Sequence, residues 1–305
     1  MTRKPETISI IVATRNDSAS SFRCLQMLAT LDNPSVTEVI IVDDGSPNSI
    51  DLPRTIANFF RNSSVQSKVV SSGGRGPAHA RNVGAAKALG SLLWFVDDDI
   101  RVCPAAAEKL LQAAIEHPRA TLGGGVVIVS PADTPKSCPS CSIDYPLVVP
   151  ISRACGPGDI WACNLMVPSD VFWGVGGFNS HAVIYGEEYE FLSRLAGGKS
   201  ELRQVAGAEV DHIRSSSDVR LRTLIHRRWI RGRNQAVNAA RFDWPLVPVR
   251  RHLRAAVRHV AHALRNHCVA GILDAVVSLG RVAGTLLPPA EANGSKPRFT
   301  SYEQS

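Results

Sequence analysis

Runs of apolar residues alternate with amphipathic stretches through the first part of the chain. Ile8–Ala13, Glu38–Val42 and Leu92–Val96 are rich in β-branched or aromatic residues, a pattern that predicts strands buried on both faces. Helical spacing of apolar residues follows the first strand, and further helices are predicted over 52–60 and 78–89. Because strands and helices alternate, the sequence predicts an α/β fold. Its Rossmann-like sheet should be mostly parallel, flanked by helices and joined by right-handed crossovers.

Three adjacent carboxylates, Asp97, Asp98 and Asp99, follow the strand predicted over 92–96. They repel one another and serve no packing purpose, yet they stand where open α/β sheets bind ligands, at the carboxyl end of a central strand. A hard divalent cation, which takes oxygen ligands and in turn binds phosphate, would account for them. An Asp-rich polar turn is the alternative interpretation.

Other titratable residues stand near predicted element ends. Arg81 lies in the first turn of a helix and either faces solvent or holds the carboxylates of the neighbouring strand ends. Glu187, Glu188 and Glu190 open another helix, where the helix dipole favours acids, or one of them is a general base. His212 ends a strand and is either a metal or phosphate ligand or a structural residue.

Composition and cysteine usage indicate an ordinary globular protein. Hydrophobic residues make up 44% of the 305 residues and charged residues 20%. The seven cysteines are an odd number and lie mostly in apolar segments, and no signal-peptide pattern opens the sequence, so we expect a reducing cytoplasmic location without a disulfide framework. A four-thiolate zinc site is one interpretation of Cys138, Cys141, Cys155 and Cys163; a mobile substrate-covering loop over 131–160 is the one we favour.

The positive charge is concentrated near the C-terminus. The net charge is +7, and residues 214–265 contain 13 arginines, no lysine and two aspartates. Such a region suggests an anionic partner, which is a membrane surface, a phosphorylated substrate or nucleic acid, unless it is simply a solvated face. RNA binding would call for aromatic residues between the arginines, and only Trp229, Phe242 and Trp244 occur, so we do not expect nucleic acid.

The same region predicts helices. Residues 249–264 form an amphipathic basic helix, with apolar residues on one face and arginines on the other. Residues 268–287 are apolar but carry Asp274, Arg281 and several glycines, which makes them too interrupted to predict a membrane span, although they suit an interface. We therefore expect a basic helical extension over 216–288 and a disordered tail over 289–305.

Five motifs occur in a particular order along the chain. They are Ile8–Asn16, Val42–Ser46, Gly76–Gly84, Phe95–Asp99, and Gly176–Asn179 followed by Gly186–Glu188. Together they resemble the family-2 glycosyltransferases, which have the nucleotide-sugar-binding A-type fold. The resemblance covers about residues 7–215 and identifies Asp97-Asp98-Asp99 with the Asp-x-Asp signature of the family.

On the donor side, the resemblance implies roles residue by residue. Asp43 or Asp44 would accept a hydrogen bond from the base, with Thr14 and Arg15 nearby, and Asp97 would face the ribose. The nucleotide-sugar site is thus expected to comprise Thr14, Arg15, Asp43, Asp44, Arg81, Asp97 and Asp98.

The resemblance also implies a metal and a base. Asp99 would bind Mg²⁺ or Mn²⁺ bridging the diphosphate, and His212 matches a position where many members carry a histidine that approaches the metal or the diphosphate. Glu188 stands where the family usually has an aspartate as the catalytic base, with Glu187 as the alternative.

These residues predict an inverting hexosyltransferase. A metal would stabilise the leaving nucleoside diphosphate, and one carboxylate would deprotonate the acceptor hydroxyl on the opposite face. By family prevalence the donor is expected to be a UDP-sugar, with dTDP- and GDP-sugars open. The acceptor would be a glycan, a lipid-linked molecule or a small molecule, consistent with polysaccharide synthesis at the inner face of a membrane.

Two alternatives remain. A sugar nucleotidyltransferase would need a glycine-rich, Arg-containing loop after the first strand, where Thr14–Asp17 stands instead. A non-catalytic membrane- or nucleic-acid-binding protein would explain the basic extension, but Asp97, Asp99 and Glu188 argue against lost chemistry. The apolar faces of the basic helices fit an anionic membrane surface or a lipid-linked acceptor better than nucleic acid.

Overall fold

A computed structural model describes residues 6–15, 19–47, 51–141, 153–181, 186–242, 244–245 and 247–287. The tail predicted over 289–305 lies outside this part of the chain, as do residues 142–152 of the predicted substrate-covering loop.

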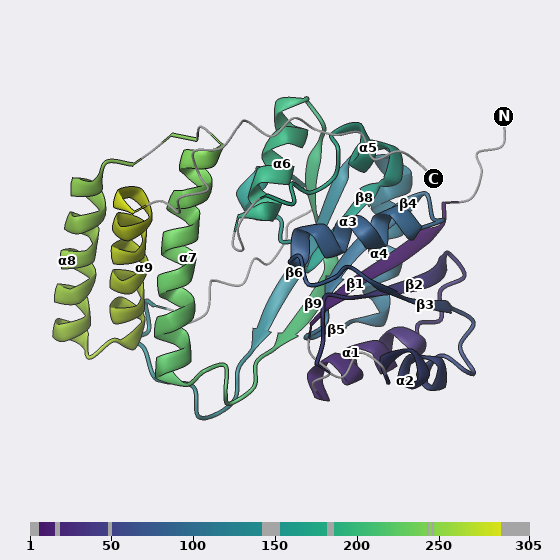
Figure 1. The fold of residues 1–305 in the computed structure, drawn as a ribbon, viewed down its shortest axis with the longest axis horizontal. Coiled ribbons are helices and arrows are strands. Elements are labelled where there is room, and N and C mark those ends of the chain that lie inside the picture. The colour runs from purple at the N-terminus through teal and green to yellow at the C-terminus, as the bar shows by residue number, and fades with distance from the viewer. Residues whose placement is uncertain are drawn as a thin grey trace.

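A nine-stranded sheet, counted over the described residues, carries the fold (Figure 1). Its strands are β1 (Ile8–Thr14), β2 (Val36–Asp43), β3 (Gln66–Ser71), β4 (Leu92–Asp97), β5 (Ile100–Val102), β6 (Thr121–Val129), β7 (Arg153–Ala154), β8 (Asn164–Pro168) and β9 (Leu202–Ile213). They are ordered β3-β2-β1-β4-β8-β6-β9-β5, and β7 also pairs with β9. Strands β3, β2, β1 and β4 are parallel, whereas β8 runs antiparallel to both of its neighbours. The predicted α/β class with a mostly parallel sheet is confirmed.

Helices cover both faces of the sheet. Side chains alternate along each strand, so an apolar strand such as β4 presents apolar residues to both faces. On β4, Trp94 packs into the core under α1 (Ala19–Ala29), α2 (Leu52–Phe59) and α4 (Pro104–Glu116). Phe95 packs into the core under α3 (Pro77–Lys87), α5 (Ser169–Gly174) and α6 (Glu187–Gly197). Its ring lies 5.2 Å from the rings of Phe172 and Phe178. Truncating one such buried ring to Ala costs about 3–5 kcal/mol, so this aromatic core anchors α5 and α6 firmly on the sheet.

Three C-terminal helices, α7 (Leu221–Arg241), α8 (Val249–Asn266) and α9 (Val269–Leu286), stand side by side next to the sheet (Figure 1). Glycines set how closely α7 and α9 approach. A Cβ at Gly232 would lie 2.1 Å from the carbonyl oxygen of Val277, and one at Gly280 would lie 2.5 Å from that of Trp229. Because real Cβ atoms do not approach so closely, the glycines that interrupt the apolar sequence of α9 are the positions at which it packs against its neighbour.

Helix α9 has the composition of a membrane span but packs between two other helices. By length and composition alone it is apolar enough to cross a membrane, with a mean hydropathy of 1.5 over Val269–Leu286. In the structure it lies between α7 and α8, and 44% of that stretch is buried inside the molecule (Figure 1).

Candidate active site

Parallel pairing brings the carboxyl ends of β1, β2 and β4 to one edge of the sheet. Thr14 lies opposite Asp43, and Ala13 lies opposite Asp97. The acidic turns after β2 and β4 therefore flank the end of β1. We call this region the acidic edge.

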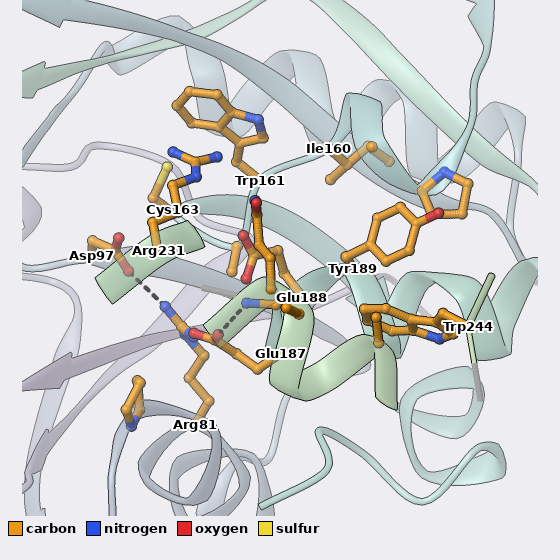
Figure 2. Close-up of a pocket in the computed structure, with 18 of the residues that line it drawn as sticks. Arg81, Asp97, Ile160, Trp161, Cys163, Glu187, Glu188, Tyr189, Arg231 and Trp244 are labelled. Carbon is orange, nitrogen blue, oxygen red and sulfur yellow. Dashed lines mark hydrogen bonds and ion pairs between the residues drawn. The ribbon is translucent and has the colours of Figure 1, made fainter. Parts of the chain in front are cut away.

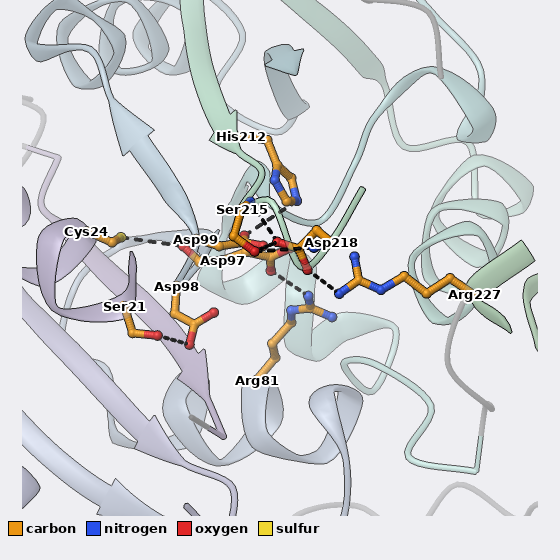
Figure 3. A network of polar contacts seen from close by, with 10 residues as sticks. All are labelled: Ser21, Cys24, Arg81, Asp97, Asp98, Asp99, His212, Ser215, Asp218 and Arg227. Carbon is orange, nitrogen blue, oxygen red and sulfur yellow. Dashed lines mark hydrogen bonds and ion pairs between the residues drawn. The ribbon is translucent and has the colours of Figure 1, made fainter. Parts of the chain in front are cut away.

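A short strand completes the acidic edge. Strand β5 starts directly after Asp99 and pairs antiparallel with β9, so that Ile100 lies opposite His212. The backbone N–H of Ile213 donates to the carbonyl oxygen of Asp99 at 2.9 Å. As a result, Nε2 of His212 lies 3.4 Å from Oδ1 of Asp99, and one ligand atom from each of Asp97, Asp99 and His212 lies within 4.8 Å of the others (Figure 3).

The Asp97–Asp99–His212 cluster suits a divalent cation. Oδ1 of Asp99 is buried and accepts no hydrogen bond from the described residues. Burial, followed by repulsion from Asp97 and Asp98, raises the pKa of Asp99 to about 8, so a proton or a cation is needed to offset its charge. Two carboxylates and one imidazole are ligands that Mg²⁺ and especially Mn²⁺ accept. The residues present therefore fit the metal that the sequence predicted.

Asp98 is directed toward α1 instead (Figure 3). Its Oδ2 accepts hydrogen bonds from Oγ1 of Thr14 at 2.6 Å and from Oγ of Ser21 at 2.8 Å. These contacts tie the turn after β4 to the end of β1 and to α1. Thr14 itself does not line the cavity described below, and its hydroxyl holds Asp98.

Arg81 joins three elements around the acidic edge. It comes from α3, and its side chain is only 7% exposed. Nη2 donates to Asp97 at 2.9 Å and Nη1 donates to Glu187 at 3.3 Å (Figure 2). Burial by itself lowers the pKa of Arg81, but the carboxylates of Asp97, Glu187 and Glu188 outweigh burial and raise the pKa above its usual value. Of the two expectations for Arg81, the inward one is correct.

The two glutamates that open α6 differ in their surroundings. Glu187 is buried, pairs with Arg81 and accepts a hydrogen bond from the backbone N–H of Gly186. Glu188 lines the cavity, and burial, followed by repulsion from Glu187, raises its pKa to about 7. A carboxylate with this pKa can accept a proton near neutral pH, which is the property a general base needs. The third acid, Glu190, forms an ion pair with Arg194 within α6.

Two contacts hold residues that lie between α5 and α6. The amide of Asn82 on α3 accepts from the N–H of Phe178 at 2.9 Å and donates to its carbonyl oxygen at 2.7 Å. At Gly186 a Cβ would lie 2.4 Å from the side chain of Asn238 on α7. The glycine therefore allows α7 to pack directly against the helix end that presents Glu188.

A cavity of about 840 Å³ connects the acidic edge to the C-terminal helices (Figure 2). The predicted site residues that line it are Arg15, Arg81, Asp97, Asp98, Asp99, Glu187, Glu188 and His212. The cavity is also lined by residues that the sequence did not identify as site residues: Arg214, Arg231 of α7, Arg281 of α9, and the aromatic residues Trp161, Tyr189 and Trp244. The rings of Tyr189 and Trp244 meet edge to face at 4.9 Å. The Arg-rich composition hinted at an anionic partner, but only the docking of the helices shows which arginines face the cavity.

Asp43 and Asp44 are placed differently from the other predicted site residues. Asp43 accepts a hydrogen bond from the N–H of Ser46 at 2.8 Å, and Asp44 accepts from Ser72 at 2.6 Å and from the N–H of Gly76 at 2.9 Å. Both are buried and neither lines the cavity. They hold the turn after β2 against the glycine-rich loop before α3, and contact with a nucleoside base stays a prediction.

Comparisons with known proteins agree with this architecture. The model of the family "Glycosyl transferase family 2" matches residues 9–162. A glycosyltransferase of Haemophilus influenzae is 35% identical over 114 residues, which are 36% of this chain and 35% of that protein. The glycosyltransferase YibD of Escherichia coli is 29% identical over 117 residues, 38% of this chain and 33% of that protein. The matches thus span about a third of the length of these relatives.

Solved structures show the same fold at low sequence identity. Staphylococcus aureus TarS 1–349, crystallised with UDP-GlcNAc, matches with a TM-score of 0.54 and 16% identity over 90% of both chains. GalNAc-T7, crystallised with UDP, GalNAc and Mn²⁺, matches with a TM-score of 0.52 and 15% identity over 68% of this chain and 43% of that one.

Proposed function

Because the chain belongs to glycosyl transferase family 2, we propose that it transfers a sugar from a nucleoside-diphosphate sugar to a hydroxyl group of an acceptor, with inversion at the anomeric carbon. One observation carries this proposal. The Asp97–Asp99–His212 cluster, which fits a divalent cation, and Glu188, which fits a general base, face the same cavity.

The donor half of the cavity suits a diphosphate. Asp99 and His212, with Asp97, would hold Mg²⁺ or Mn²⁺, which would offset the negative charge of the leaving nucleoside diphosphate. Arg214, Arg231 and Arg281 line the same cavity and add positive charge to it. The UDP and UDP-GlcNAc in the two solved structures make UDP-sugars the first donors to test, ahead of dTDP- and GDP-sugars.

Glu188 would accept the proton of the acceptor hydroxyl. Its neighbour Glu187 is held by Arg81 and therefore serves to position the helix end rather than to exchange protons. Its repulsion contributes to the raised pKa of Glu188, which keeps that carboxylate basic enough to work near neutral pH. A single displacement with one base and no covalent intermediate inverts the anomeric centre.

Calorimetric binding of UDP, dTDP and GDP, each with and without Mn²⁺, tests the proposal. We expect one nucleotide to bind, and to bind much more tightly when Mn²⁺ is present. If none of the three binds with Mn²⁺ or Mg²⁺, the transferase proposal is wrong and the basic helices become the better guide to function.

The surface of α8 supports a membrane-associated acceptor. Leu253, Val257, Val260 and Leu264 recur at helical spacing and are 45–75% exposed, while the small residues Ala256 and Ala263 are buried. Arginines at 250, 251, 254, 258 and 265 follow the same helix. An exposed apolar stripe beside arginines is the pattern of a helix that lies in an anionic membrane surface. We therefore place the enzyme at the inner face of the membrane, with a glycan or lipid-linked molecule as the acceptor.

Sedimentation with vesicles tests this placement. The wild type should sediment with phosphatidylglycerol vesicles but not with phosphatidylcholine vesicles, and high salt should release it. Val257→Asp with Leu264→Asp should abolish sedimentation. Leu89→Asp, at an apolar residue that is 81% exposed next to α3, is the matched control and should sediment like the wild type. Equal sedimentation of all variants, or none by the wild type, contradicts the proposal.

A further inference from the structure

We propose that Cys138, Cys141, His262 and Cys268 form a structural zinc site that fastens the C-terminal helices to the sheet. The four ligand atoms lie within 4.8 Å of one another. They come from two parts of the chain: the loop after β6 contributes the first two cysteines, the last turns of α8 contribute the histidine, and the α8–α9 turn contributes the third cysteine. This inference does not rest on the transferase proposal.

The distances fit a tetrahedral ion. Nε2 of His262 lies 3.4 Å from Sγ of Cys138 and 3.2 Å from Sγ of Cys141. With zinc–sulfur bonds of about 2.3 Å and zinc–nitrogen bonds of about 2.0–2.1 Å, a sulfur and a nitrogen ligand should lie about 3.6 Å apart. Small side-chain movements therefore suffice to admit the ion.

The surrounding polar groups orient the ligands as a zinc site requires. Nδ1 of His262 lies 3.2 Å from the side-chain amide of Asn266, which leaves Nε2 facing the thiols. The backbone N–H of Cys138 points to Sγ of Cys268 at 3.5 Å, and the N–H of Cys141 donates to the carbonyl oxygen of Cys138 at 3.0 Å. The first of these contacts would stabilise the thiolate of Cys268, and the second fixes the turn between the two cysteines.

The spacing of the four ligands in the sequence is consistent with a zinc site once the fold is known. Cys-x₂-Cys is a common zinc half-site, and His262 with Cys268 supplies the second half. The four-cysteine set considered from the sequence alone is wrong in two members. Cys163 is buried at the wall of the active-site cavity, and neither it nor Cys155 belongs to the cluster. All seven cysteines are described and none forms a disulfide.

A closed site with four protein ligands is typical of structural rather than catalytic zinc. Leu224, Ala270 and Leu273 form a small apolar cluster together with Cys268, and Cys138 and Cys141 pack against it. The ion would thus join the loop after β6 to α7 and α9. Because these helices carry Arg231 and Arg281 into the cavity, the site fixes one wall of the active site.

Metal analysis of the purified full chain tests the site. Protein expressed with zinc and dialysed against buffer should contain about one zinc ion per chain. After cobalt exchange it should show the visible bands of tetrahedral cobalt and a thiolate-to-cobalt charge-transfer band. Cys268→Ser should lose both the zinc and the charge-transfer intensity. Cys103→Ser, at an exposed cysteine outside the cluster, is the control and should keep them.

A second variant separates ligand loss from misfolding. His262→Cys replaces one zinc ligand by another, so it should keep the zinc and shift the cobalt spectrum toward that of four thiolates. Wild-type protein without zinc overturns the proposal, and so does zinc retained at full occupancy in Cys268→Ser. A disulfide between Cys138 and Cys141, detected as two cysteines that escape alkylation after denaturation with a chelator but without a reductant, also overturns it.

Discussion

Two groups of metal-ligating side chains in this molecule differ in their chemistry. The Asp97–Asp99–His212 cluster offers two carboxylates and one imidazole and opens onto the cavity. The Cys138–Cys141–His262–Cys268 cluster offers three thiols and one imidazole and lies against apolar residues of α7 and α9. The first has room for a substrate and hard ligands, and the second has soft ligands and a complete set of four.

This difference in ligands shows how one chain can bind a different metal ion at each of two sites. Carboxylates exchange Mg²⁺ or Mn²⁺ readily and leave coordination positions for a diphosphate, whereas thiolates select zinc and hold it. We propose that the first site serves turnover and that the second serves the shape of the cavity. Substitutions at the acidic edge should therefore have the largest effects on turnover.

The largest effect is expected for Asp99→Asn. An amide keeps the size of the side chain but removes the charge that would hold the cation beside the diphosphate. Because a metal supplies several kcal/mol of charge stabilisation, turnover should fall about 10⁴-fold. Release of nucleoside diphosphate from the donor, with water or an identified acceptor, measures it. A loss of less than tenfold would show that Asp99 holds no essential metal.

Glu188→Gln should lower turnover about 10³-fold, because general-base catalysis typically contributes 10²–10⁴-fold. The wild type should lose activity as the pH falls below about 7, since the carboxylate, whose raised pKa lies there, must be ionised to accept a proton. Glu187, Arg81 and Arg231 are the charged groups that act on it. Rates at saturating Mn²⁺ across the pH range check this.

The variant should lose the acidic limb of the pH profile together with its rate. A profile of unchanged shape at reduced rate would indicate a positioning role for Glu188. An unchanged rate would show that Glu188 is not the general base and would favour Glu187 in that role.

A smaller energetic effect is expected for Arg81→Met. Removing the guanidinium leaves Asp97 and Glu187 without their buried partner, which costs about 3 kcal/mol of the free energy of unfolding. Arg119→Met is the matched control, because its ion pair with Asp170 is exposed on both sides and contributes about 0–1 kcal/mol. Urea unfolding of both variants measures the difference. Equal destabilisation would contradict the bridging role of Arg81.

Local sequence patterns predicted the strands and the acidic residues at their ends. They did not predict the long-range strand pairing that brings these residues together. Residues 10–13 and 92–96 are apolar over their whole length, which made their burial predictable. The contact between Asp99 and His212 depends on β5, which has three residues and is too short to give a periodic signal. Only the long-range pairing of β5 with β9 brings the two side chains together.

The part of the cavity lined by α7 and α9 could not be predicted from the sequence for a similar reason. The arginines of α7 and α9 were counted as part of a basic region, but which of them faces the cavity depends on how the helices cross. Gly232 and Gly280 determine that crossing through close backbone contacts, which no local pattern reveals. The zinc ligands His262 and Cys268 are likewise separated from Cys138 by more than a hundred residues, so no short motif contains them.

Counting both metals in the same sample shows whether the two sites hold different ions. Zinc-containing wild-type protein and Asp99→Asn would be titrated with Mn²⁺ in the presence of UDP, with free Mn²⁺ followed by electron paramagnetic resonance and zinc by elemental analysis. We predict one bound Mn²⁺ and one zinc per wild-type chain, and in Asp99→Asn the zinc without the Mn²⁺. Mn²⁺ bound equally by both proteins would contradict a metal-dependent donor site at the acidic edge.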